Sequence, residues 1–286
     1  KFPGAVTTYC IEAMMQDRKA LQSGTSHFLG KNFAKASEIK FQNRNGEMEY
    51  AWTTSWGVST RLIGALIMAH SDDNGLVLPP KIAPSHIAII PIYKNDEEKQ
   101  IVMDFAIKVQ NIFKGLYLDD IQIFTEMDTR DMTSSERNWY WIKKGIPLRL
   151  EIGPRDIVND SVMLARRDKE PKDKHSIKID NLVDYVLKTL SEMQEGYYQR
   201  ALNCRDKWTV DIDDKEEFYR FFNSKNEEQE ISGGFANSHW CGNQSCEEKI
   251  KDDLKVTIRC IPFEAKEEEG KCIYCGEKSN RRVIFA

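Results

Sequence analysis

The sequence lacks a long hydrophobic run, and it contains no internal repeat or low-complexity tract. A helix that crosses a bilayer needs about 18 or more consecutive apolar residues, so we expect no membrane span. The first residues also lack the charged, apolar and small-residue pattern of a secretory signal. These absences predict a cytoplasmic protein that does not bind membranes.

The chain also lacks the even set of cysteines that is typical of a disulfide framework. Its seven cysteines are an odd number in a sequence without an export signal, which argues against structural disulfides. Four of them form two close pairs, Cys241-x4-Cys246 and Cys272-x2-Cys275. Gly276 allows a tight turn that brings backbone amides near the sulfurs. Two such pairs favour a closed tetrahedral zinc site, with free or disulfide-linked thiols as the alternative. His239 and Cys260 could substitute as ligands, but a lone cysteine in an apolar strand is more often a small buried residue, so we do not count Cys260 among the ligands.

Excess positive charge is absent as well, because the formal net charge is -4. A surface that binds nucleic acid needs a local excess of lysine and arginine. The middle third of the chain has such an excess: Lys143, Lys144, Arg149, Arg155, Arg166, Arg167, Lys169, Lys172 and Lys174. The segment 211–230 is acidic. Ordinary solvated surfaces are the alternative explanation for both segments.

The length of 286 residues suits two or three domains. Residues 1–80 predict strands and a helix, and they end at Pro79 and Pro80, which break regular structure. Residues 81–200 alternate strands with helices, which predicts a mixed or parallel sheet covered on both faces. Residues 201–286 combine a short helix, strands and the cysteine pairs. We therefore expect a multidomain α/β and α+β protein with units 1–80, 81–200 and 201–286.

Hydrophobic periodicity gives approximate bounds for the elements. Strands are expected over residues 50–54, 87–92, 121–125, 147–152, 161–166, 256–261 and 283–285. Helices are expected after Gly57, over 97–113, around Trp139 and Trp141, and over 179–202 and 215–222.

Two polar segments stand out in the first unit. The segment Gln22-Ser-Gly-Thr-Ser-His27 offers an amide, hydroxyls and an imidazole within six residues, and Gly24 lets the backbone approach a ligand. Arg61 falls in the first turn of the expected helix, where the helix dipole disfavours a cation. The arginine therefore predicts an anionic partner such as a phosphate. The alternative is an exposed arginine without a partner.

These segments, with several others, resemble the prolyl-tRNA synthetases of the archaeal and eukaryotic type. The similar segments are Lys1-Phe-Pro-Gly4, Gly24-Thr-Ser-His-Phe-Leu-Gly30, Ser55-Trp-Gly-Val-Ser-Thr-Arg-Leu-Ile-Gly64, Asp72-Asp-Asn-Gly-Leu-Val-Leu-Pro-Pro80, Leu148-Arg-Leu-Glu-Ile-Gly-Pro-Arg-Asp156 and Arg259-Cys-Ile-Pro-Phe263. The resemblance implies three parts: the motif 3 region of a class II antiparallel-sheet catalytic domain, an anticodon-binding domain with a mixed five-stranded sheet, and a small α+β zinc-binding domain.

The family activates L-proline with ATP and Mg²⁺ to prolyl-adenylate and transfers proline to tRNA(Pro). The resemblance implies this activity, a homodimer and four groups of site residues. The residues at ATP are Gln22, Thr25, Ser59 and Arg61. The residues at proline are Phe2, His27 and Ser55. The residues at the anticodon are Arg149, Glu151 and Arg155, and the metal ligands are Cys241, Cys246, Cys272 and Cys275.

The chemistry of these residue types fits the implied roles. Arg61 would be the catalytic residue, because a guanidinium stabilises the charge that develops as a carboxylate attacks the α-phosphorus. Phe2 and Trp56 would provide flat walls for a pyrrolidine ring, or would simply be core residues. Arg149, Glu151 and Arg155 alternate along one strand and its exit and would meet guanine edges, with an ion pair between Arg149 and Glu151 as the alternative.

The chain also departs from the family pattern. Two further motifs of class II synthetases would lie upstream of Lys1, so we expect this chain to be inactive without them. Family members often have an acidic residue at the position of Ile142, which puts one anticodon contact in doubt. The alternatives are a non-catalytic tRNA-binding module of synthetase origin and another class II synthetase, such as one for threonine or glycine.

Overall fold

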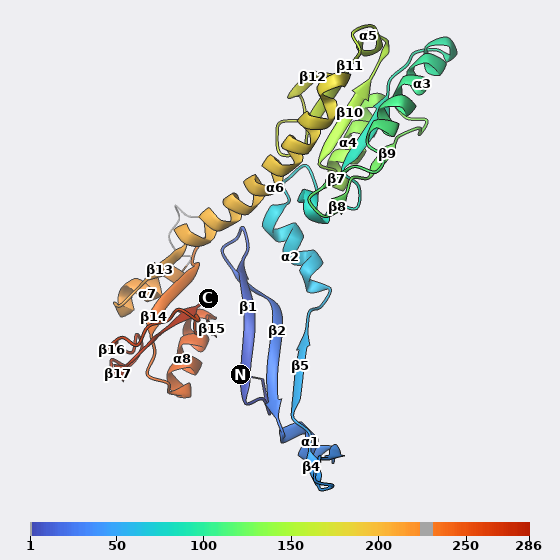
Figure 1. Ribbon diagram of the computed structural model, residues 1–286. Helices are drawn as coiled ribbons and strands as arrows, with labels where there is room; N and C mark the ends of the chain where they lie inside the picture. The colour runs from blue at the N-terminus through green and yellow to red at the C-terminus, as the bar shows by residue number, and fades with distance from the viewer. Residues whose placement is uncertain (1, 224–230) are drawn as a thin grey trace. The chain divides into compact units, whose positions relative to one another are not determined.

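The computed structural model describes residues 2–223 and 231–286 (Figure 1). The acidic segment 211–230 therefore lies partly outside the described residues. Two compact units are present, one formed by residues 1–69 together with 202–286 and the other by residues 70–201. The expected division into three domains stays a prediction. Among the described residues, no helix has both the length and the apolarity that a membrane crossing requires.

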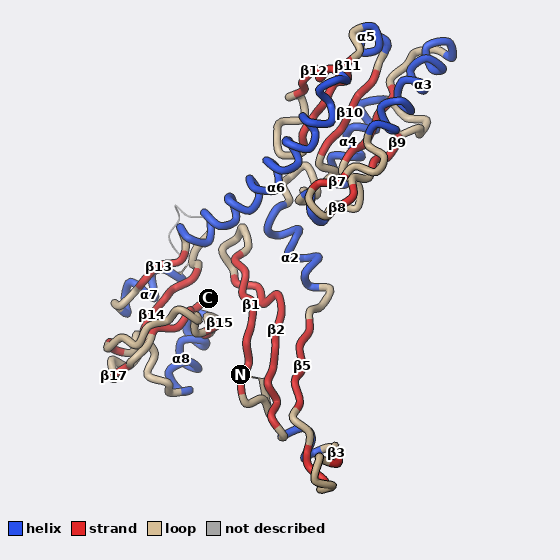
Figure 2. The backbone as a smooth tube through the Cα atoms, viewed as in Figure 1, coloured by secondary structure: helices blue, strands red, loops and turns tan. Residues whose placement is uncertain are grey.

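A three-stranded antiparallel sheet dominates the N-terminal part of the first unit. Its strand order is β1 (Thr7–Met14), β2 (Ala20–Gly30) and β5 (Thr53–Gly57). A short helix α1 (Asn32–Ala36) and the hairpin of β3 (Lys40–Gln42) and β4 (Met48–Tyr50) separate β2 from β5 (Figure 2). The strand expected over residues 50–54 is wrong, because β4 ends at Tyr50 and β5 begins three residues later. Helix α2 (Arg61–His70) follows, with Arg61 in its first turn as expected.

A β-bulge in β2 sets which side chains share a face of this sheet. Glu12 pairs with Gln22 and Ile11 pairs with Gly24, so Ser23 is an extra residue without a partner on β1. Side chains alternate between faces along a strand, and one extra residue reverses that alternation. Gln22 therefore lies on the same face as Thr25, although their separation of three residues would otherwise place them on opposite faces.

The second unit is a five-stranded mixed sheet, as the resemblance implied. The strand order is β12 (Lys174–Lys178), β11 (Ser161–Arg166), β10 (Leu148–Ile152), β6 (Ile87–Pro91) and β9 (Thr125–Met127). β10, β6 and β9 are mutually parallel, whereas β11 and β12 are antiparallel to their neighbours. Shorter elements complete the unit: η1 (Pro80–Ile82), β7 (Tyr117–Leu118), β8 (Ile121–Gln122), α5 (Pro154–Val158) and η2 (Ile179–Asn181).

Helices cover both faces of the sheet, which confirms the expectation from the alternating pattern. Leu148, Leu150 and Ile152 of β10 face a core that α3 (Asp96–Ile112) and α6 (Leu182–Lys207) complete. The alternate residues of β10 face α4 (Ser134–Lys144). A capping box at Thr133 starts α4, and Gly145 in the left-handed conformation ends it.

The segment after α2 docks on the end of α4. Leu76 N donates to Lys143 O, and Leu78 N donates to Gly145 O. A Cβ on Gly145 would lie 2.7 Å from Leu76 O, and one on Gly75 would lie 2.7 Å from Lys143 Cα. The motif around Asp72 therefore requires glycine on both sides of this contact. Arg167, which is buried, donates to both carboxylate oxygens of Asp72 and closes the same junction.

The C-terminal part of the first unit is a four-stranded sheet with two helices. The strand order is β13 (Thr209–Asp211), β14 (Phe235–His239), β18 (Arg282–Phe285) and β15 (Ile258–Cys260). The helices are α7 (Lys215–Phe222) and α8 (Gln244–Leu254), and a small ladder joins β16 (Gly270–Lys271) to β17 (Lys278–Ser279). Phe218 of α7 packs edge-on against Phe285, with ring centroids 5.2 Å apart, so α7 contributes an apolar side chain to the core.

Candidate functional site

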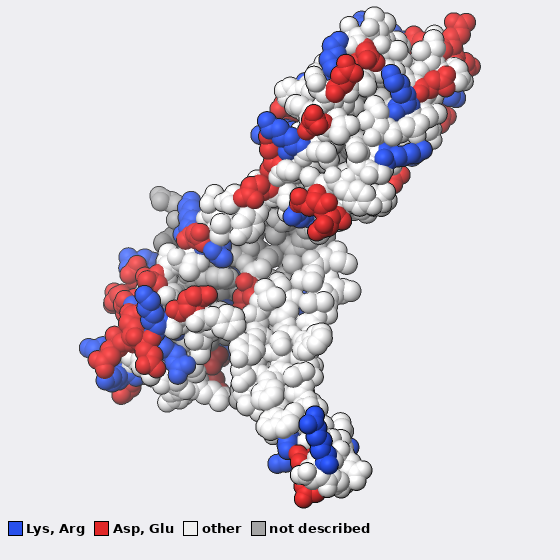
Figure 3. Space-filling model, in the orientation of Figure 1, with Lys and Arg blue, Asp and Glu red and all other residues white. Residues whose placement is uncertain are grey.

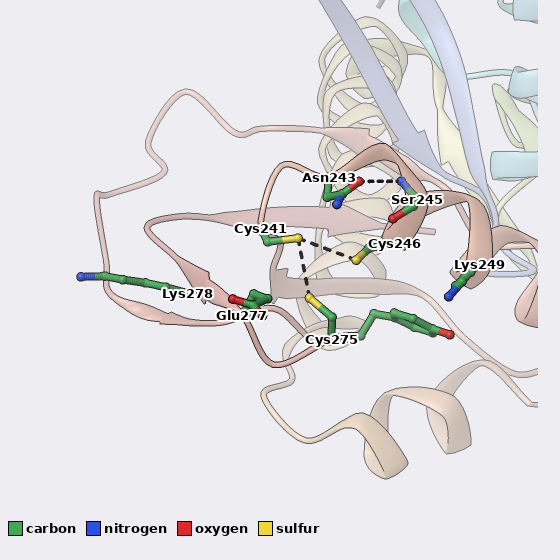
Figure 4. Close-up of a pocket in the computed structure, with 9 residues that line it drawn as sticks. Cys241, Asn243, Ser245, Cys246, Lys249, Cys275, Glu277 and Lys278 are labelled. Carbon is green, nitrogen blue, oxygen red and sulfur yellow. Dashed lines mark hydrogen bonds between the residues drawn. The ribbon is translucent and has the colours of Figure 1, made fainter.

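The four paired cysteines converge on one point beyond the end of β14. Figure 4 shows three of them, Cys241, Cys246 and Cys275. The four sulfur atoms all lie within 4.8 Å of one another. Cys241 Sγ lies 3.7 Å from Cys246 Sγ and 3.8 Å from Cys275 Sγ. A tetrahedral metal with bonds of about 2.3 Å places its sulfur ligands about 3.8 Å apart, whereas a disulfide needs about 2.05 Å. The spacing therefore fits a metal centre and not the disulfide alternative.

The local backbone sets the positions of these thiols and shifts their pKa values. Cys241 follows β14, Cys246 lies in the first turn of α8, and the other two cysteines flank the turn between β16 and β17. Burial raises the pKa of Cys246 to about 12, and the neighbouring thiols add to the effect. Burial also acts to raise the pKa of Cys272, but backbone hydrogen bonds from Cys275 and Tyr274 outweigh it and lower the pKa to about 7. A bound cation would remove the repulsion among four thiolates.

The substitute ligands considered from the sequence do not join this cluster. His239 is buried, with Nδ1 3.2 Å from Ser279 Oγ and Nε2 3.5 Å from a carboxylate oxygen of Glu268. Cys260 lies on β15, outside the cluster. Gly276 has φ of +76° and donates its N–H to Cys272 O, as the expected tight turn requires. Among the described residues, the four cysteines are the one converging group of three or more metal-binding side chains.

On the α4 side of the five-stranded sheet, Arg149 is a buried cation with unused donors. Its side chain is fully enclosed, and Nε donates to Asn138 Oδ1 at 3.1 Å. Within the described residues, neither terminal guanidinium nitrogen has a hydrogen-bond partner. Burial lowers the pKa of Arg149 to about 10, so the group is charged at neutral pH. Each unsatisfied buried donor costs about 1–3 kcal/mol, which makes this arginine ready for a hydrogen-bonding ligand.

Glu151 lies on the same face of β10 but does not pair with Arg149. Its Oε1 accepts a hydrogen bond from Lys174 Nζ at 2.6 Å, so the ion-pair alternative for Arg149 and Glu151 is not what the structure shows. Arg155 is exposed in α5, after the strand has ended. Strand alternation therefore does not set the direction of the Arg155 side chain, and its place at the anticodon stays a prediction. Ile142, at the position that departs from the family, is buried and offers no polar contact.

Part of the positive charge in the basic segment of the middle third is neutralised by carboxylates. Arg166 pairs with Asp168 and Glu192, Arg167 pairs with Asp72, and Lys174 pairs with Glu151. On the face shown in Figure 3, blue and red side chains are interspersed over the second unit. Recognition by Arg149 would therefore depend on a specific contact more than on a broad positive field.

Four of the predicted N-terminal residues lie on one face of the three-stranded sheet. His27 pairs with Ser55 across β2 and β5, and the bulge places Gln22 and Thr25 on the same face. The Phe2 ring lies next to the His27 ring at a tilt of 30°, with centroids 4.4 Å apart. The predicted proline-binding residues are thus adjacent.

Two further contacts shape this region. His27 Nδ1 lies 3.1 Å from Thr8 Oγ1 on β1, which holds the imidazole ring. Trp56 is next to Ser55 on β5 and therefore on the opposite face, where it is 76% exposed. Trp56 is not a wall of this site, because neighbouring residues of a strand do not share a face. It is not a core residue either, because its side chain is exposed.

Arg61 connects the start of α2 to the same strand. Its NH1 donates to Gln22 O at 3.2 Å, and its backbone N–H donates to Ser59 Oγ at 3.4 Å. The predicted ATP-binding residues therefore gather around Gln22, while the phosphate partner of Arg61 stays a prediction. Sequence reasoning missed Thr8, Glu12 and Asn138, which orient the predicted residues; no motif marks them, since each acts through a contact between separate elements.

Two family models match parts of the chain. A model described as the anticodon-binding domain matches residues 86–189, and one described as the C-terminal domain of prolyl-tRNA synthetase matches residues 226–286. These two models leave residues 1–85 uncovered, so assigning the three-stranded sheet to a class II catalytic domain stays a prediction.

Relatives align with the entire chain. It is 47% identical to proline–tRNA ligase 2 of Anaeromyxobacter dehalogenans, covering 100% of this chain and 57% of that protein. It is 48% identical to the proline–tRNA ligase of Rhodopirellula baltica and 46% identical to that of Bdellovibrio bacteriovorus, covering 100% of this chain and 56% of each. The chain thus spans little more than half the length of these relatives. All three relatives are named as proline–tRNA ligases. This naming favours neither alternative from the sequence, the non-catalytic tRNA-binding module or a synthetase for another amino acid. Along its entire length the chain is therefore similar to proline–tRNA ligases, and its residues 226–286 match the C-terminal domain of prolyl-tRNA synthetase.

Proposed function

We propose that the protein is a prolyl-tRNA synthetase that activates L-proline with ATP and Mg²⁺ and transfers proline to tRNA(Pro). The observation that carries this proposal is the gathering of Gln22, Thr25, His27 and Ser55 on one sheet face, with Arg61 bonded to Gln22 O. Phe2, His27 and Ser55 would border the pyrrolidine ring. Ser59 and Thr25 would contact ATP, and the Arg61 guanidinium would stabilise the negative charge that develops at the α-phosphate.

The second unit would bind the anticodon on the α4 side of its sheet. The two unpaired nitrogens of Arg149 can donate together to O6 and N7 of guanine, and Glu151 can accept from the amino and imino groups of a base. Unstacked anticodon bases expose these edges. Arg155, exposed in α5, would contact the tRNA from a separate element.

The cysteine cluster would hold Zn²⁺ as a structural ion. Four cysteine sulfurs leave a tetrahedral ion without an open position, so the metal would contribute folding energy and not catalysis. The proposed cytoplasmic location and homodimer are supported by the resemblance alone.

The direct test is ATP–pyrophosphate exchange on the full-length protein with proline, threonine, glycine or alanine. We expect exchange with proline alone and its loss in Arg61→Ala. Exchange with a different amino acid, or with none, would contradict the proposed function.

A further inference from the structure

A series of side-chain contacts leads from the C-terminal sheet to Gln22. Gln22 Nε2 donates to Glu12 Oε1 at 3.1 Å. Glu12 Oε2 accepts from Nε and NH2 of Arg259, at 3.1 and 2.9 Å. The Glu12 side chain is 4% exposed and that of Arg259 is 25% exposed. One buried carboxylate therefore joins an amide on β2 to a guanidinium on β15.

The backbone places Arg259 beside the first strand. β1 is the edge strand of its sheet, and β15 contacts it (Figure 1). Cys10 Sγ lies 3.7 Å from Arg259 O, and the rings of Tyr9 and Phe263 are 5.6 Å apart. Residues separated by about 250 positions in the sequence thus meet along one strand.

The chemistry of this chain of contacts fixes the orientation of the Gln22 amide. A buried carboxylate is strongly unfavourable without a cation, so Glu12 depends on Arg259. An ionised carboxylate only accepts hydrogen bonds, so Glu12 must face the NH₂ group of Gln22. The carbonyl Oε1 of Gln22 then remains available as an acceptor. Arg61 meanwhile holds the backbone carbonyl of the same residue.

We propose that Arg259 is a positioning residue for the nucleotide site, acting through Glu12 on Gln22. The inference rests on the proposed role of Gln22 at ATP. It assigns Gln22 to a hydroxyl or amino group of the nucleoside, because an acceptor does not bind a phosphate oxygen. It also makes the C-terminal sheet a contributor to ATP binding, beyond its proposed structural metal.

The chain offers a matched control in Arg18. Its guanidinium lies 3.3 Å from the Trp208 ring centroid, and NH1 donates to Ile231 O at 2.7 Å. Like Arg259, Arg18 connects the β1–β2 hairpin to the C-terminal part of the unit. Within the described part of the chain, Arg18 has no hydrogen bond or ion pair with Glu12 or Gln22. Replacing it therefore loosens the same junction without releasing the Gln22 amide.

The experiment compares Arg259→Met, Arg259→Lys and Arg18→Met in the full-length protein, by KM for ATP and for proline in pyrophosphate exchange. We expect Arg259→Met to raise the KM for ATP about tenfold without changing the KM for proline. Arg259→Lys should recover part of the loss, and Arg18→Met should change neither constant. Equal effects of Arg259→Met and Arg18→Met, or equal effects on ATP and proline, would overturn the inference.

A second variant guards against simple unfolding. Arg259→Met leaves Glu12 buried without a cation, so the double variant Glu12→Gln/Arg259→Met removes both charges together. We expect it to match the wild-type melting temperature more closely than Arg259→Met does, while its KM for ATP stays raised. A normal KM for ATP in a folded double variant would contradict the positioning role.

The outcomes separate this inference from the proposed function. A wild-type protein that exchanges with proline, together with a normal Arg259→Met variant, removes only the inference. If the wild type shows no exchange, equilibrium dialysis with ATP alone decides: weaker binding in Arg259→Met than in Arg18→Met supports the inference, and equal binding or no binding overturns it.

Discussion

At the scale of single residues, Arg149 has buried hydrogen-bond donors that lower stability while unpaired and that a ligand could use. Its terminal nitrogens are buried without partners, and a methionine of similar length would remove those unsatisfied donors. We expect Arg149→Met to weaken binding of tRNA(Pro) by about 1–3 kcal/mol without lowering the melting temperature. Fluorescence anisotropy with labelled tRNA and thermal unfolding measure the two quantities.

Arg166 provides the control for that experiment, because carboxylates of Asp168 and Glu192 accept from its guanidinium. Arg166→Met should lower the melting temperature and leave tRNA affinity unchanged. A lower melting temperature with unchanged tRNA affinity in Arg149→Met would show that the buried Arg149 serves packing and not recognition.

Cys272 is the cysteine of the cluster with a depressed thiol pKa, and its loss should abolish metal binding. We expect one zinc ion per wild-type chain by elemental analysis and close to none in Cys272→Ser. The variant should also be less stable, since a structural metal contributes directly to folding. Cys204→Ser on α6 is the control and should retain the ion; equal metal content in both variants would exclude the cysteine site.

At the scale of elements, the junction between the Asp72 segment and α4 depends on glycine. Gly145 has φ of +74°, and a Cβ there would meet Leu76 O at 2.7 Å. Both the left-handed conformation and the contact oppose a side chain. We expect Gly145→Ala to lower the free energy of unfolding by about 2 kcal/mol, measured with denaturant.

Gly196 in α6 is the matched comparison. A Cβ at this helical position meets nothing within 4 Å, and alanine is favoured over glycine in a helix interior by about 1 kcal/mol. Gly196→Ala should therefore be stabilising or neutral. A loss of stability in Gly196→Ala as large as that in Gly145→Ala would remove the special role of the junction.

Elements with strong periodicity were predictable from the sequence. The helix over 215–222 and the strand over 161–166 have their expected bounds, because hydrophobic spacing and flanking polar residues agree there. The strand near Thr53 was misplaced, since two short aromatic segments, around Tyr50 and Trp52, gave no signal of where pairing begins. Arg155 does not follow the strand pattern, because Pro154 starts a short helix directly after the strand.

At the scale of the whole molecule, stability should fall as the pH drops below about 6.5. Burial is the first cause that lowers the pKa of His86 and of His70 below the ordinary 6.5; a hydrogen bond to Pro80 O opposes it at His86, and Arg200 adds to it at His70. Their neutral forms are therefore favoured by the fold. Above 6.5 this contribution is complete, and it is lost as the pH falls through the lower pKa of the folded protein, because the unfolded chain binds more protons.

Melting temperatures between pH 7.5 and about 5 measure this effect. His86→Gln removes one titrating group and should flatten the dependence. A profile that is flat in the wild type, or equally steep in His86→Gln, would contradict the assignment. Asp72 and Asp128 also have lowered pKa values, but their contribution is lost only at more acidic pH, below their ordinary value of 3.8.

Much of the candidate site could be predicted from the sequence, but the residues that orient its side chains could not. The cysteine spacing predicted the cluster of four cysteines, and motif similarity selected the residues around Gln22 and Arg149. The contact of Glu12 with Arg259 joins residues 247 positions apart, and no periodicity reports such pairing. The same is true of Asn138, which orients Arg149 from a different element.

The bulge at Ser23 also has an evolutionary consequence. Substitutions at this position should be tolerated, because the residue has no partner on β1, whereas a one-residue deletion would rotate Gln22 to the other side of the sheet and separate it from Glu12. Natural variation in this hairpin should therefore change its composition more readily than its length.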